Sequence, residues 1–143
     1  MFSQVPADGN NVADSTNDEI LTARFSRLGI CPAVTTRLRT DDFSQVLSVA
    51  ATLAAVTAAV DTLMAQIATV LDSGEETLAI VKTGFLRMNP TVIRIRCAER
   101  GDGITSVDVH ASAKEGLIRQ RGAHQAVREF TGRLESLVPL ATA

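Results

Sequence analysis

The chain has 143 residues, of which 45% are hydrophobic and 21% charged, and a formal net charge of −2 at pH 7. This balance excludes an intrinsically disordered chain and fits one domain with a hydrophobic core. Residues 1–76 hold ten acidic and four basic side chains, and residues 77–143 hold six and ten. We attribute that difference to solvated surface rather than to an anionic partner.

The number and spacing of the cysteines indicate the redox state of the cellular compartment. Cys31 and Cys97 are far apart and form no CxxC motif, which is not a disulfide framework, so a reducing cytoplasm is expected. The N-terminus lacks the basic and apolar regions of a secretory signal. The uncharged run over residues 46–60 is shorter than the roughly 20 residues of a membrane-spanning helix, so we expect no membrane span.

The N-terminal part predicts a tail followed by a helix. Residues 1–16 are rich in Asn, Asp, Ser and Gly without periodicity, so we expect a disordered tail before a single domain over residues 17–140. Thr16 and Glu19 form a capping box, and the apolar residues after it predict a helix that ends at Gly29. The β-branched residues 33–39 then predict a short strand.

The clearest periodicity predicts one long helix over residues 42–72. Thr40, Asp41 and Asp42 would cap its start. Its flanking positions are uncharged, which favours burial inside the domain; self-association into a homodimer is the alternative. Large apolar residues recur at alternating spacings of three and four, which places them along one helix face: Val46, Val49, Leu53, Val56, Val60, Leu63, Ile67 and Val70.

The second half predicts strands. Residues 77–86 have the pattern of a strand, with a turn at Asn89-Pro90. Residues 91–99 and 104–111 alternate between apolar and polar side chains on either side of residues 100–103, which is typical of a β-hairpin. If the turn is centred near Asp102, Cys97 pairs with Val107, and both belong to the apolar face.

A helix completes the chain. It would follow Gly116 and present one apolar face, formed by Leu117, Ala123, Val127, Phe130, Leu134 and Leu137. The predicted order is therefore helix, strand, long helix, three-strand antiparallel meander and helix, which is an α+β domain. Basic residues on the last helix alternate with glutamates and lack aromatic neighbours, so we do not expect nucleic-acid binding.

The predicted hairpin register also bears on catalysis. Cys97, Asp108 and His110 suggest a Cys-His-Asp arrangement, but Cys97 and His110 fall on opposite faces because side chains alternate along a strand. We therefore assign no catalytic residue. His110 and His124 lie on different elements without the spacing of metal ligands, so no metal or cofactor is expected.

A polar patch remains on the even-numbered face of the hairpin, formed by Arg94, Arg96, Asp108 and His110. We interpret it as cross-strand charge pairs on a solvated surface. The alternative is a site for a carboxylate or phosphate, which the arginine fork can bind in a bidentate way. An enzyme that acts through this patch is the least favoured function.

Two stretches carry a family resemblance. PAVTTRLRTDDFSQVL resembles a first strand leading into a helix, and GDGITSVDVHASAKEGLIRQRGAHQAVREFTGRLESL resembles a last strand and a long helix. Together they are similar to the helix-grip fold of the START and polyketide-cyclase-like (SRPBCC) superfamily, in a reduced form. The resemblance implies a small hydrophobic ligand between the sheet and the C-terminal helix, lined by Phe85, Ile93, Ile95, Val107, Val109, Leu117, Val127 and Phe130.

We therefore expect a non-enzymatic binding module for a small hydrophobic ligand. The alternative is a structural or interaction protein that self-associates through helix 42–72.

Overall fold

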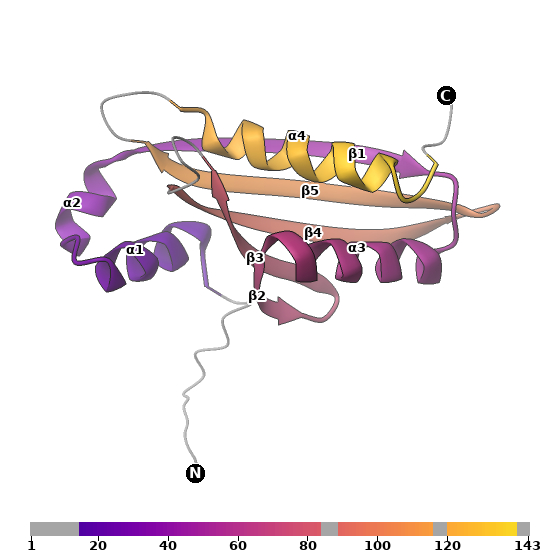
Figure 1. Cartoon of the computed structure of the whole chain (residues 1–143), viewed down its shortest axis with the longest axis horizontal. Helices are drawn as coiled ribbons and strands as arrows, with labels where there is room; N and C mark the ends of the chain where they lie inside the picture. Colours follow the sequence, from indigo (N-terminus) through magenta and orange to yellow (C-terminus); the bar gives the residue numbers. More distant parts are fainter. Residues whose placement is uncertain (1–14, 84–88, 116–119, 140–143) are drawn as a thin grey trace, which may run out of the picture.

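The computed structural model describes residues 15–83, 89–115 and 120–139, so most of the predicted tail lies outside the described residues. Five strands form one antiparallel sheet in the order β1-β5-β4-β3-β2 (Figure 1). The strands are β1 (Arg39–Val49), β2 (Thr69–Ser73), β3 (Glu76–Thr83), β4 (Asn89–Gly101) and β5 (Ile104–Glu115), and the helices are α1 (Asn17–Arg27), α2 (Pro32–Arg37), α3 (Leu53–Ile67) and α4 (Gly122–Glu135). The predicted α+β class is confirmed.

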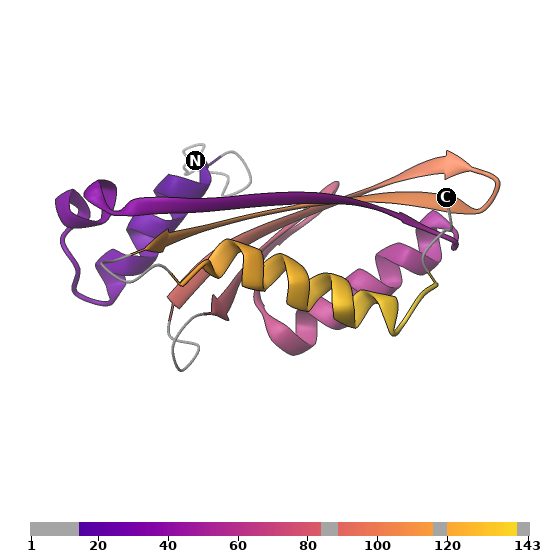
Figure 2. The same ribbon diagram turned by 90° about the horizontal axis from the view of Figure 1, so that it is seen from above.

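The sheet separates two apolar clusters. On the face that we call inner, α3 and α4 lie side by side over the strands (Figure 2), and the odd-numbered residues of β3, β4 and β5 pack against Val60 and Phe130. On the outer face, Ile20 and Leu21 of α1 pack against Leu78, Ile80 and Val92. The inner cluster is the larger, and it forms the main core.

The start of the chain contains one confirmed helix and one wrong prediction. The capping box is present, because Thr16 Oγ1 accepts a hydrogen bond from the Glu19 N–H and the Glu19 carboxylate accepts one from the Thr16 N–H. The strand predicted over residues 33–39 is wrong. Residues 33–37 belong to α2, which has Pro32 at its first position, where the missing N–H costs nothing, and β1 begins only at Arg39.

The long helix predicted over residues 42–72 is also wrong. Strand β1 covers its first part, α3 begins after Thr52, whose hydroxyl caps it, and β2 follows Ala68. Residues at both ends of the apolar series are exposed, with Val46 at 64% and Val70 at 42%. Only the middle of the series behaves as predicted, since Val56, Val60 and Leu63 form the buried face of α3.

The β4–β5 hairpin is confirmed with its register. Cys97 pairs with Val107, Arg96 with Asp108 and Arg94 with His110. The turn contains Asp102 and Gly103, with φ of 54° and 72°. Two consecutive positive φ values are typical of the tight turn that follows the right-handed twist of a hairpin, and Asp-Gly is a favoured pair there.

The turn predicted at Asn89-Pro90 is wrong, because both residues belong to β4 and pair with β3. Pro90 is tolerated because β5 pairs with β4 only from Thr91 onward, so Pro90 has a neighbouring strand on one side only. The predicted strand at residues 77–86 is confirmed as β3 up to Thr83, beyond which it lies outside the described residues.

The C-terminal helix is present, but it begins at Gly122 rather than directly after Gly116. Its predicted face is confirmed for Ala123, Val127, Phe130 and Leu134, which are buried, and wrong for Leu137, which is 52% exposed and lies beyond the helix. Leu117 lies outside the described residues.

Candidate functional site

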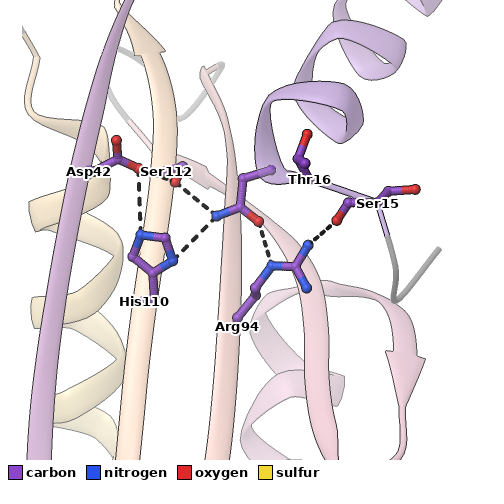
Figure 3. A pocket seen from close by; sticks show the side chains of 7 residues that line it. Ser15, Thr16, Asp42, Arg94, His110 and Ser112 are labelled. Atoms are coloured by element: carbon purple, nitrogen blue, oxygen red, sulfur yellow. Dashed lines mark hydrogen bonds and ion pairs between the residues drawn. The ribbon is translucent and has the colours of Figure 1, made fainter.

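The predicted polar patch lies on the outer face, next to the start of α1. Strand pairing brings Arg94 beside His110. Asn17, the first residue of α1, and Ser15 and Thr16 just before it add further polar groups (Figure 3). The resulting depression is open and has a volume of about 490 Å³.

Arg94 is the centre of this network, and its bonds are internal to the protein. Its side chain is 15% exposed and pairs with Glu76 at 3.0 Å. It also donates to the Asn17 side-chain oxygen and to the Ser15 carbonyl. A largely buried cation needs such partners to offset its lost hydration. Arg94 therefore fastens the start of α1 to the sheet.

His110 occupies the other side of the depression. Its Nε2 lies 3.5 Å from Asp42 Oδ1, and its Nδ1 lies 3.4 Å from Asn17 Nδ2. Asn17 also donates to Ser112 Oγ at 2.9 Å, and Ser112 in turn donates to Asp42. These contacts link β1, β5 and α1 in one hydrogen-bonded chain.

Arg96 forms a cross-strand ion pair, but its partner lies outside the predicted patch. Arg96 lies opposite Asp108 in the register, but its ion pair is with Glu76, at 3.9 Å. Within the described residues, no ion pair joins Arg96 to Asp108. Cys97 packs against the inner core, so the structure keeps it apart from His110, as the alternation of side chains predicted.

Two further polar contacts were not recognised in the sequence. The side chain of Lys114 is only 3% exposed, and it forms an ion pair with Asp18 of α1 and a hydrogen bond of 3.0 Å to Thr40. A buried lysine gives no local sequence signal, because its partners come from helix and strand segments about 75 to 95 positions away. This contact also serves to hold α1 on the outer face.

The start of α4 is capped by one carboxylate distant in sequence, Asp41, and by one nearby, Glu115. Asp41 Oδ2 accepts a hydrogen bond from the Ala123 N–H at 2.9 Å and lies 3.3 Å from His124 Nδ1. Glu115 Oε1 accepts hydrogen bonds from the N–H groups of Gln120 and Arg121. Negative charge at a helix N-terminus satisfies its unpaired donors and its dipole. Asp41 therefore caps α4 rather than the predicted helix 42–72.

The predicted ligand-lining residues gather on the inner face. Phe85 and Leu117 lie outside the described residues. The others are Ile93, Ile95, Val107, Val109, Val127 and Phe130, and each is between 0% and 2% exposed. They belong to one apolar cluster, so they pack against one another, and their contact with a ligand stays a prediction.

A hollow opens at the edge of this cluster, between the sheet and α4. It has a volume of about 290 Å³ and is bounded by the end of α3, by β3 and by α4. Ile67, Val81 and Ala126 supply apolar surface, whereas Gln66, Lys82, Glu129 and Arg133 are polar. Arg133 is paired with Glu129 at 3.1 Å. We call this site the α4 hollow.

Two features are absent from the described residues. Among them, no three side chains of His, Cys, Asp or Glu lie close enough together to hold a metal ion. Nor does any described helix combine the length and apolar character needed to cross a membrane.

Comparison with known proteins identified distant structural neighbours. No protein-family model and no curated protein matches the sequence. The crystal structure of Ara h 8.0201 aligns with a TM-score of 0.43 and 10% identity, over 69% of this chain and 95% of that one. A conserved protein of unknown function from Enterococcus faecalis, EF2215, aligns with a TM-score of 0.44 and 10% identity, over 85% and 82%.

The predicted order of strand, helix, antiparallel meander and C-terminal helix is present in the chain itself, with α3 and α4 on one face of the sheet. This is a helix-grip-like arrangement with a four-strand meander, one strand more than predicted. Neighbours as distant as these do not indicate which ligand or partner this protein binds.

Proposed function

We propose that this protein is a non-enzymatic binding module for a small hydrophobic ligand, held in the α4 hollow between the sheet and α4. The observation that carries the proposal is the hollow itself, where about 290 Å³ lies over Ile67, Val81 and Ala126. Ligand pockets commonly measure about 300–1,000 Å³. The occupant is therefore small.

The rim of the hollow suggests the shape of the ligand. Lys82 is exposed on β3, and Arg133 lies across from it on α4. A ligand with an apolar body and an acidic end would cover the apolar residues and place its carboxylate near Lys82. A longer ligand would reach the buried Val127 and Phe130 only if α4 moved away from the sheet.

The first test is calorimetric titration with two matched probes, octanoate and octanol. Ile67→Trp should fill the hollow and abolish binding of both, while circular dichroism stays that of the folded protein. Leu137→Trp adds the same ring at an exposed position outside the hollow, so this control should bind both probes as the wild type does.

A second variant tests the acidic end. Lys82→Gln should weaken octanoate binding about threefold to fivefold, as expected for an exposed charge pair, and leave octanol binding unchanged. Absence of saturable binding by the wild type, or equal binding by Ile67→Trp, would contradict the proposal. Native mass spectrometry of the purified protein would then identify the natural occupant by its mass.

A further inference from the structure

A second hollow lies on the inner face, under the N-terminal half of α3. It has a volume of about 200 Å³ and shares none of its lining residues with the α4 hollow. Leu53 and Val60 of α3 form one wall, Ile95 and Cys97 of β4 form another, and the turn between β2 and β3 lies at its rim. We call it the α3 pocket.

The size and lining of the α3 pocket match a single ring. An engineered cavity of about 150 Å³ lined by Leu, Ile and Phe binds benzene. The α3 pocket is somewhat larger, and Val60 and Ile95 give it an apolar wall that is itself only 2% exposed. It therefore has room for an aromatic ring and one substituent.

Thr77 makes this pocket different from a simple packing defect. Its side chain lines the pocket and the residue is 8% exposed, yet its hydroxyl has no hydrogen-bond partner among the described residues. Elsewhere in the core a threonine is paired, as Thr83 is with the Thr91 hydroxyl at 2.8 Å. The Thr77 hydroxyl keeps contact with the solvent in the pocket, so a polar group on a ligand would replace water as its hydrogen-bond partner.

Charge around the pocket selects against anions. Burial raises the pKa of the Cys97 thiol, and the carboxylates of Asp61 and Asp108 raise it further. The thiol therefore stays neutral at pH 7, and the same carboxylates repel a negative ligand. Glu75 at the rim adds a further acidic group.

We propose that the α3 pocket binds a small neutral aromatic compound, one ring with a single hydroxyl or carbonyl group. The ring lies against Val60, Ile95 and Cys97, and its polar group bonds to the Thr77 hydroxyl. This inference does not rest on the proposed function, because the two hollows have separate walls.

Cys97 supplies the readout. In a Cys31→Ser background, Cys97 is the only thiol, and Cys31 is exposed and makes no side-chain cap to α2. Phenol should protect Cys97 from alkylation by iodoacetamide in a saturable way. Benzoate, which has the same ring and a negative charge, should protect at least tenfold less well.

Thr77→Val tests the polar contact, because it removes the hydroxyl and keeps the shape. It should weaken phenol binding about tenfold, roughly the contribution of one hydrogen bond. Protection of Cys97 by toluene, which has no hydroxyl group, should stay unchanged. Thr62→Val, an exposed change on α3 outside the pocket, is the matched control and should have no effect. Ile67→Trp should also leave phenol protection intact, which separates this site from the α4 hollow.

Three results would overturn the inference. Absence of saturable protection by phenol in the Cys31→Ser protein would mean that the pocket holds water only. Equal protection of Thr77→Val and the parent by phenol would remove Thr77 from the site. Equal protection by benzoate and phenol would show that the pocket does not select for neutral compounds.

Discussion

The two faces of the sheet hold their helices in different ways. On the outer face, α1 is fastened by the polar contacts of Arg94 and Lys114 beside a small apolar cluster. On the inner face, α3 and α4 are held by apolar packing around Phe130, which is fully buried. The outer depression is larger than either inner hollow, but its main polar groups are bonded within the protein. A ligand there must break those bonds, whereas a ligand in either inner hollow covers apolar surface that is still open.

The largest expected effect is on the inner face. Phe130→Ala removes a fully buried ring from the core and should lower the free energy of unfolding by about 3–5 kcal/mol, measured by urea denaturation. Leu137→Ala, at a position that is 52% exposed, should change it by less than about 0.5 kcal/mol. Similar losses in the two variants would contradict the assignment of the core.

On the outer face, loss of the Arg94 contacts should destabilise α1 without affecting α4. Arg94→Ala leaves Glu76 and Asn17 without their main partner and should cost about 3 kcal/mol. Amide hydrogen exchange should accelerate in α1 and stay unchanged in α4. Arg96 is the matched control, because its side chain is 60% exposed and 3.9 Å from Glu76; its change to alanine should cost less than about 0.5 kcal/mol. Uniform acceleration across both helices would show that α1 is not fastened independently.

Two glycines of α4 should respond with opposite sign. A Cβ atom at Gly122 would lie 2.7 Å from Thr83 Oγ1 and 3.0 Å from the Ala113 Cβ, so Gly122→Ala should cost about 1–3 kcal/mol. At Gly132 nothing lies within 4 Å, so Gly132→Ala should stabilise the protein by about 0.5–1 kcal/mol. Thermal denaturation measures both, and stabilisation by Gly122→Ala would contradict the close approach of α4 to the sheet.

The distant cap of α4 should have a smaller effect. Asp41→Ala removes the acceptor for the Ala123 N–H and should cost about 1 kcal/mol. Asp41→Asn keeps an oxygen acceptor and loses the charge, so it should recover part of that loss. Equal stability of the wild type and Asp41→Ala would show that the helix does not depend on this cap.

The smallest expected effect concerns Cys97 and pH. Because the pKa of its thiol is raised above 9.0, the folded protein keeps the proton at a pH where the unfolded chain has lost it. The stability that this contributes is complete below pH 9.0 and falls as the pH rises through the folded-state pKa. Alkylation of Cys97 should shift to lower pH in Asp108→Asn, and no shift would exclude that carboxylate as a cause.

The hairpin shows where a sequence pattern predicts the structure correctly, and the segment over residues 42–72 shows where one fails. In the hairpin, alternation and an Asp-Gly turn are both local, and together they predicted the register from Arg94 to His110. In residues 42–72, uncharged alanines and valines satisfied a helical spacing throughout. The boundaries there depend on which residues find a strand partner. Val46 pairs with Asp108 in the sheet and points away from the core, which no local pattern indicates.

The contacts at the candidate sites also divide into local ones, which the sequence predicted, and distant ones, which it did not. The polar patch was predicted because its members lie on one hairpin, whereas Lys114–Asp18 and Asp41–Ala123 join residues that are distant in the chain. Asp41 was correctly recognised as a helix cap and assigned to the wrong helix. The chemistry of a carboxylate is local, but the helix end that it meets is decided by the fold.

By itself, the sequence determined the α+β class, the capping box of α1, the hairpin with its register and the buried face of α4, because each depends on neighbours within a few positions. Only the tertiary structure decided the limits of β1 and α3, the capping of α4 and the two inner hollows. Those features arise where segments far apart in the chain meet, and their energies come from contacts that no local pattern contains.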